Sequence, residues 1–214
     1  MTENLTLPQL MTVSAGETKD VFVGQAESYG RLGIYGGHFL GQALAAGFET
    51  VDGSKLAQSF HAYFIKAGNP VAPIHYHVTR IREGRKSELR NIEAKQEGEA
   101  VFTMHASFKV PEVGESHQPK APVVDSPESV IQAREDRGES LFPFPITQHG
   151  RVQMEFITES FREFTPDRDP FLRLWMRVPG CESIDEHLKQ CVLAYLSDGT
   201  LMFNSVIPYG TPFQ

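Results

Sequence analysis

The chain has 214 residues, a length that suits one large domain or two small ones. Its composition is 40% hydrophobic and 22% charged, which is ordinary for a globular protein. The formal net charge of −7 argues against a nucleic-acid partner, because binding of phosphates requires a basic surface. The apolar runs are too short to cross a bilayer, so we expect no membrane span.

The two ends of the chain and its cysteines favour a cytoplasmic protein. No basic segment followed by an apolar core comes after Met1, as a secretory signal would require. Cys181 and Cys191 are the only cysteines and do not form a CxxC pair. We therefore expect reduced thiols and a cytoplasmic location. Separately, we expect no cofactor and no bound metal.

The first half of the chain carries the clearest pattern of secondary structure. The expected elements are a strand at residues 21–23, a helix at 38–51 and strands at 56–65, 74–81, 88–96 and 100–110. The strand at 88–96 is the most polar, which favours an edge position or a solvated face. A long helix followed by strands in hairpin series predicts an α+β unit with an antiparallel sheet wrapped around the helix.

The second half is expected to be less complete. Residues 113–140 are rich in Pro, Glu, Ser and Gln and are interpreted as a linker, with a short helix near 127–136. Residues 141–214 then supply strands at 152–157 and 171–178, a helix at 183–198 and a further strand at 203–207. The predicted units are therefore 1–112 and 141–214. If Trp175 and its apolar neighbours are exposed, they mark an interface, and we expect a homo-oligomer.

Asp198 is the most informative residue of the second half. Ser183 and Glu186 have the spacing of a capping box that starts a helix. Asp198 follows Tyr195 of that helix by three residues, so it falls on or beside the apolar face. The helix dipole disfavours a negative charge at that end. Such a carboxylate suits a catalytic base or a group that orients water, although a solvated carboxylate is the other interpretation.

Several polar residues elsewhere have two interpretations. His38 and Gln42 lie one helical turn apart and either line a pocket or support the start of a helix. His75 and His77 share one face of a strand, which is half of a zinc site or, by preference, a pair of surface histidines. A basic cluster around one turn could meet the phosphates of a nucleotide, but a solvated turn is favoured; its members are Arg82, Arg85, Lys86 and Arg90.

Four segments together resemble the acyl-CoA thioesterase II family, whose members have two hotdog units. The run YGGHFLGQALAA at 35–46 is similar to the glycine-glycine entry into the family's first central helix. SFHAYF at 59–64 and VFTMHASF at 101–108 resemble strands of the first unit. LAYLSD at 193–198 resembles the end of the second central helix. These segments cover most of the chain in the family's order.

The resemblance implies hydrolysis of acyl-CoA to a fatty acid and coenzyme A. By this resemblance Asp198 is the catalytic aspartate, and the substrate-binding residues lie at the start of the first central helix, at Tyr35, Gly37, His38 and Gln42. The family also uses a Thr or Ser before a Leu/Ile-Asp-His run and a Gln in a Gln-Glu-Gly run, and neither has a matching position in the second half. The run at 96–98 falls in the first half, which is the non-catalytic unit of the family.

The departure from the family pattern leaves three functions open. The chain looks like a family member shortened at its C-terminus, so we expect weak activity or none from this polypeptide alone. A catalytically silent protein that binds acyl-CoA or an acyl chain is the alternative function. A purely structural or interaction protein is the third possibility.

Overall fold

The computed structural model describes residues 5–30, 33–140, 145–157 and 171–209. Contacts along the chain divide it into two compact units. The first comprises residues 1–113 and 180–197, and the second comprises 114–179 and 198–214. Each unit is described by itself. In the described part of the chain, no helix is both long and apolar enough to cross a membrane.

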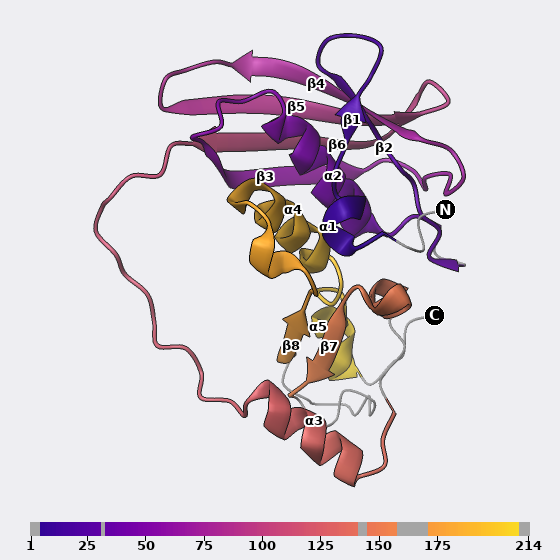
Figure 1. Ribbon diagram of the computed structural model, residues 1–214, viewed down its shortest axis with the longest axis vertical. Coiled ribbons are helices and arrows are strands. Elements are labelled where there is room, and N and C mark those ends of the chain that lie inside the picture. The colour runs from indigo at the N-terminus through magenta and orange to yellow at the C-terminus, as the bar shows by residue number, and fades with distance from the viewer. Residues whose placement is uncertain (1–4, 31–32, 141–144, 158–170, 210–214) are drawn as a thin grey trace. The chain divides into compact units, whose positions relative to one another are not determined.

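A six-stranded antiparallel sheet forms the larger part of the first unit (Figure 1). Its strands in spatial order are β1 (Ser14–Ala15), β2 (Val21–Gly24), β4 (Ile74–Arg82), β5 (Ser87–Gln96), β6 (Glu99–Lys109) and β3 (Leu56–Phe64). β5 and β6 are joined by a tight turn in which Glu97 and Gly98 both have positive φ, as a two-residue hairpin turn requires. All of the strands expected between residues 21 and 110 are present, whereas β1 was not predicted.

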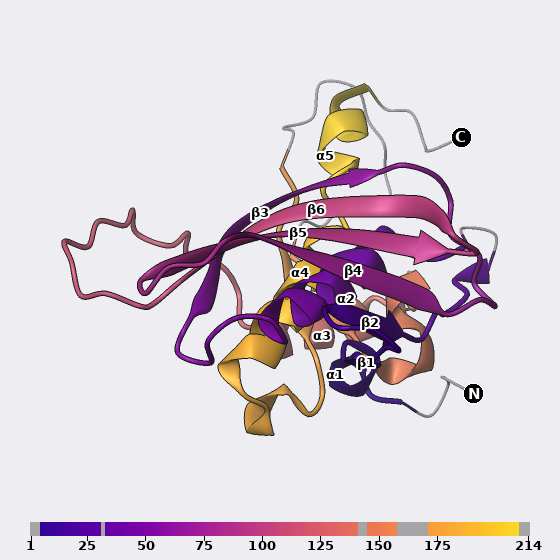
Figure 2. The same ribbon diagram turned by 90° about the horizontal axis from the view of Figure 1, so that it is seen from above.

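The central helix α2 (Gly36–Phe48) lies under the concave face of this sheet (Figure 2). Its predicted apolar stripe is buried along the helix, at Leu40, Leu44 and Phe48. The core between helix and sheet is filled from the facing strands by Tyr76, Ile92, Phe102, Met104 and Phe108. The first unit therefore has the predicted helix wrapped by an antiparallel sheet. A short helix before it, α1 (Leu7–Leu10), was not predicted and begins with a capping box made by Thr6 and Gln9.

The polar strand β5 is central in the sheet, so the edge position was wrong. The alternative of a solvated face fits its outward residues, which are only half-buried. Its alternate residues face α2 and are buried, and they include the polar Glu88, Arg90 and Gln96. The prediction failed because these buried polar groups have partners in the fold. Polar side chains can be buried when their hydrogen bonds are satisfied, and composition alone does not reveal the partners.

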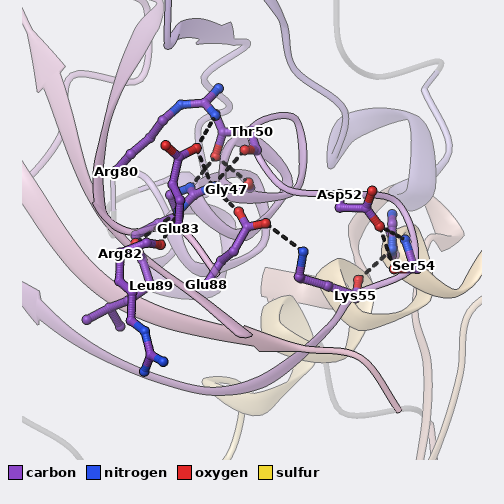
Figure 3. A network of polar contacts seen from close by, with 12 residues as sticks. Gly47, Thr50, Asp52, Ser54, Lys55, Arg80, Arg82, Glu83, Glu88 and Leu89 are labelled. Atoms are coloured by element: carbon purple, nitrogen blue, oxygen red, sulfur yellow. Dashed lines mark hydrogen bonds and ion pairs between the residues drawn. The ribbon is translucent and has the colours of Figure 1, made fainter. Parts of the chain in front are cut away.

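A buried polar network lies at the C-terminal end of α2, where Figure 3 shows Thr50, Lys55 and Glu88. Arg90 joins Thr50 to Glu88 in this network. Its guanidinium donates to the backbone oxygen of Thr50 at 2.8 Å and to that residue's hydroxyl at 2.9 Å. Glu88 lies between two cations, because it contacts Arg90 and accepts from Lys55 Nζ at 2.6 Å. Cations are favoured at a helix C-terminus. Of the four basic residues predicted around one turn, Arg90 is buried and does not belong to a surface cluster. Arg82, Arg85 and Lys86 are exposed, as the favoured interpretation of a solvated turn expects, and Lys86 is paired with Glu112.

The last helix of the first unit is α4 (Glu186–Ser197), preceded by a short 3-10 turn at Cys181–Ser183. Asp185 caps it, because its side chain accepts from the backbone amide of Leu188 at 2.8 Å. The predicted cap at Ser183 was therefore wrong by two residues. The expected inner face is correct, since Cys191, Val192 and Tyr195 are buried.

The second unit contains short elements only, among its described residues. They are α3 (Pro127–Asp136), a 3-10 helix at Pro145–Gly150, the antiparallel hairpin of β7 (Gln153–Phe156) and β8 (Leu174–Arg177), α5 (Phe203–Val206) and a 3-10 turn at Ile207–Tyr209. Residues 203–207 are therefore helical, and the strand predicted there was wrong. Trp175 on β8 keeps 38% of its surface exposed and donates through its ring N–H to the backbone oxygen of Asp125.

Candidate active site

The start of α2 lies against the end of α4, and the two helices run in opposite directions. A Cβ atom added to Gly37 would stand 2.1 Å from the backbone oxygen of Tyr195. One turn further along, a Cβ atom on Gly41 would stand 2.9 Å from the backbone oxygen of Cys191. Both distances are shorter than real contacts allow. The glycines of the sequence motif therefore let the two backbones approach closely.

Three tyrosines meet at this helix crossing. The hydroxyl of Tyr35 donates to the backbone oxygen of Tyr195 at 2.9 Å, and their rings pack edge to face with centroids 4.9 Å apart. The hydroxyls of Tyr29 and Tyr195 form a buried hydrogen bond of 2.8 Å. Burial raises the pKa of the Tyr29 hydroxyl far above its ordinary value, so this group stays neutral. The three tyrosines therefore connect the start of α2 to the end of α4 through uncharged hydrogen bonds and ring contacts.

His38 and Gln42, predicted to bind substrate, are fully buried beside this joint. His38 Nε2 lies 2.8 Å from the backbone oxygen of Gln25. The side-chain nitrogen of Gln42 donates to the backbone oxygen of Leu10 at 2.7 Å, and its side-chain oxygen accepts from the hydroxyl of Tyr76 at 3.0 Å. These bonds support the structural interpretation of both residues, and contact with a substrate stays a prediction.

Asp198 is the first residue after α4. It is partly buried and interacts with its surroundings, so it is not a carboxylate pointing freely into water. The sequence therefore placed it correctly at the end of the helix. Tyr195, whose backbone receives the bond from Tyr35, lies three residues earlier.

Tyr29 and Gln190 are two polar residues whose roles the sequence did not indicate. The amide side chain of Gln190, on α4, accepts from Ala57 N at 2.8 Å and donates to Ala57 O at 3.1 Å. These two bonds satisfy backbone groups at the start of β3 that a neighbouring strand would otherwise bond. Neither Tyr29 nor Gln190 lies in a motif, and their partners are 133 or more residues away in sequence. No local signal could have found them.

The Gln-Glu-Gly run of the first half has a structural role. The Gln96 side chain accepts from the backbone amide of Asn69 at 2.7 Å and donates to the backbone oxygens of Asn69 and Ala72 at 2.8 Å. Its hydrogen bonds therefore hold the turn between β3 and β4. This use agrees with the expectation that this run is not the catalytic one.

Two cavities lie apart from the predicted site residues. One of about 740 Å³ lies within the second unit, between α3 and the β7–β8 hairpin, where Ile131, Met154 and Trp175 line it. Another of about 370 Å³ lies in the first unit beside Phe48, His187 and Cys191. Burial raises the pKa of the Cys191 thiol, so it is a poor nucleophile. No described group of three or more His, Cys, Asp or Glu residues could hold a metal ion.

Comparison with known proteins relates the chain to one family. Residues 25–109 match the family described as "Acyl-CoA thioesterase N-terminal domain". The protein named "Acyl-CoA thioesterase 2" from Haemophilus influenzae is 27% identical over 201 residues, which is 90% of this chain and 70% of that protein. "Acyl-coenzyme A thioesterase 8" of mouse is 29% identical over 195 residues. The chain spans 61% of the mouse protein, which is less than two thirds of its length.

Solved structures agree with the observed fold. An acyl-CoA thioesterase II, TesB2, from Mycobacterium marinum has a TM-score of 0.70 at 26% identity, covering 90% of this chain and 68% of that one. The tesB protein MAP1729c of Mycobacterium avium subs paratuberculosis has a TM-score of 0.75 at 26% identity, covering 94% of this chain and 71% of that chain. A hotdog-fold protein of unknown function from Alicyclobacillus acidocaldarius has a TM-score of 0.73 at 24% identity, over 96% and 72%. The predicted α+β hotdog fold is therefore confirmed.

Proposed function

Residues 25–109 belong to the acyl-CoA thioesterase N-terminal domain family, and from this premise we propose that the chain hydrolyses acyl-CoA to a free fatty acid and coenzyme A. The observation that carries the proposal is the similarity to proteins named acyl-CoA thioesterases through 90% of the chain, well beyond the matched domain.

Asp198 is the catalytic group of the proposed reaction. It removes a proton from a water molecule as that water attacks the thioester carbonyl carbon. The carbonyl oxygen then carries a negative charge, which backbone amides at a helix N-terminus can stabilise. Collapse of the intermediate breaks the C–S bond, and the leaving sulfur takes the proton held by Asp198, which gives the coenzyme A thiol and the fatty acid.

Thiol release tests the proposed reaction. Wild type is assayed with saturated acyl-CoA substrates of several chain lengths, and Asp198→Asn removes the base while keeping the shape of the side chain. We expect weak but measurable release by wild type and a fall of about 100-fold or more in the variant, as for other removed catalytic bases. Asp125→Asn, an exposed position, is the matched control and is expected to keep wild-type activity.

The same assay separates the alternative functions. Equal, background release by wild type and Asp198→Asn would contradict hydrolysis by this residue. If wild type then still bound a non-hydrolysable acyl-CoA thioether in calorimetry, the silent acyl-CoA-binding function would replace it. Absence of both release and binding would leave the structural or interaction function.

We also propose that the chain forms a homo-oligomer and works in the cytoplasm. Self-association is supported by β3, an edge strand of the six-stranded sheet that exposes Phe60, Tyr63 and Phe64. The cytoplasmic location is supported by Cys181 and Cys191, which are both free thiols.

A further inference from the structure

We propose that Tyr35 is a positioning residue whose hydroxyl holds the last turn of α4 and so fixes the place of Asp198. The proposal rests on the proposed function, in which Asp198 is the catalytic base. It differs from the assignment of Tyr35 as a substrate-binding residue, because the hydroxyl acts on the protein backbone.

The bond from Tyr35 satisfies a backbone group that a helix end leaves open. The last four carbonyl groups of a helix have no partner further along the same helix. In α4 these belong to residues 194–197. Ser197 donates its hydroxyl to the backbone oxygen of Ala194 at 2.8 Å, and Tyr35 donates to that of Tyr195 at 2.9 Å. The final turn of α4 is therefore held by one bond within the helix, from Ser197, and by one bond from Tyr35, the residue before α2.

Tyr35 is well placed to act as a fixed support. It is the residue before the first turn of α2, and its own backbone oxygen accepts from His38 N at 3.0 Å. Its ring is packed against Tyr195 at 4.9 Å and against Tyr29 at 5.7 Å. The Tyr29 hydroxyl bonds that of Tyr195 at 2.8 Å, so Tyr195 is held through both its backbone and its ring.

The position of Tyr195 controls the position of Asp198. The two residues are three apart, less than one helical turn of 3.6 residues. A phenol has one proton to donate, and that of Tyr35 is directed at the backbone of α4. Loss of this bond frees the last turn while the rest of the helix remains packed. A shift of about 1 Å in a catalytic group can cost roughly 100-fold in rate.

The test is Tyr35→Phe in the full chain, which keeps the ring and removes the hydroxyl. We expect kcat for acyl-CoA hydrolysis to fall about 10- to 100-fold with KM changed less than about twofold. In the Asp198→Asn background the same substitution should add no further loss, because Tyr35 acts through Asp198. Tyr209→Phe, which removes an exposed hydroxyl far from β3 in sequence, is the matched control and should leave both constants unchanged.

Hydrogen exchange supplies a readout that does not depend on activity. Tyr35→Phe should speed amide exchange in a peptide covering residues 196–203 and leave peptides of β4 and β5 unchanged. A rise in KM with unchanged kcat would assign Tyr35 to substrate binding and overturn the proposal. Unchanged exchange at 196–203 would overturn it as well. If wild type has no activity, the proposed function fails and exchange alone decides whether Tyr35 holds this turn.

Discussion

Gly37 shows how one residue determines the crossing of two helices. A side chain there would meet the backbone of α4, and backbone cannot move aside as a flexible side chain can. Glycine inside a helix lowers stability by about 1 kcal/mol relative to alanine, so a helix keeps it only where packing requires it. Gly37 and Gly41 of the motif are therefore explained by the close approach of α2 and α4.

Gly37→Ala should destabilise the first unit although alanine is the better helix former. The added methyl group requires α4 to move away from α2, and overpacking of this kind costs about 1–3 kcal/mol. We expect a lower midpoint in urea unfolding with circular dichroism as the signal. Gly53→Ala is the matched control, since its Cβ would have no atom within 4 Å. Equal midpoints for the two variants would contradict the close contact.

The residues of the candidate site were predictable only where they lie in motifs. The spacing of the second helix places Tyr195 on its inner face and Asp198 at its end, as observed. It could not show that Tyr35 and Tyr29 meet Tyr195, because the contacts join residues 160 and 166 positions apart. Local periodicity gives the face of a helix, whereas the partner of that face depends on the whole fold.

At the scale of elements, β3 is a strand with an open edge. The backbone amide of Ile65 points to β6, where it donates to Val101 O at 2.9 Å. Backbone groups alternate along a strand, so those of Phe60, Ala62 and Phe64 point away from β6. The strand contains no Asp, Glu, Lys or Arg, the residues that protect many natural edges. A second copy of β3 can therefore pair with it antiparallel without charge repulsion.

Ala62→Pro should prevent this pairing without unfolding the subunit. Proline removes an amide that points out of the sheet, which an edge strand tolerates. We expect light scattering after size-exclusion chromatography to show a larger particle for wild type and a monomer for the variant. Ala62→Ser keeps the amide and should behave as wild type. A folded Ala62→Pro variant of wild-type mass would exclude β3 as the interface.

Elements were predicted correctly where an apolar pattern in the sequence reflects one buried face, and wrongly where burial depends on tertiary partners or where a short apolar run is ambiguous. Alternating apolar residues identified β4 and β6, because one face of each packs on α2. The edge alternative for β5 was wrong, because the strand's inner face buries polar side chains that have tertiary partners. The strand predicted at 203–207 was wrong as well, since a short apolar run does not distinguish strand from helix.

At the scale of the whole molecule, surface ion pairs make the free energy of unfolding depend on pH in the acidic range. Hydrogen bonds from Arg80 hold the pKa values of Asp20 and Glu83 below their ordinary range. Lys109 and Lys86 lower the pKa of Glu112 to about 2. A carboxylate with a lowered pKa stabilises the folded state above its unfolded pKa of about 4. That contribution is lost as pH falls through the folded pKa.

Stability should therefore decrease as pH falls from about 5 towards 2. Urea unfolding at several pH values measures how steeply the free energy of unfolding changes with pH. Asp20→Asn should reduce this slope, because asparagine carries no carboxylate that can titrate beside Arg80. Asparagine is the appropriate substitute, since Asp20 has a φ of 58° and asparagine tolerates this left-handed conformation. A slope that is the same in both proteins would show that the Asp20–Arg80 pair contributes nothing to acid sensitivity.

The sequence by itself indicated the resemblance to a family, and it determined the hotdog fold and the order of elements in the first half, because helix and strand periodicity and short motifs are local properties. It also placed Asp198 at the end of a helix. Only the tertiary structure decided that α4 packs on α2, that Arg90 and Glu88 are buried, and that Tyr35 bonds the backbone of Tyr195. These features join residues far apart in the chain. Their stability comes from burial and from satisfied hydrogen bonds, which exist only once the fold has brought the partners together.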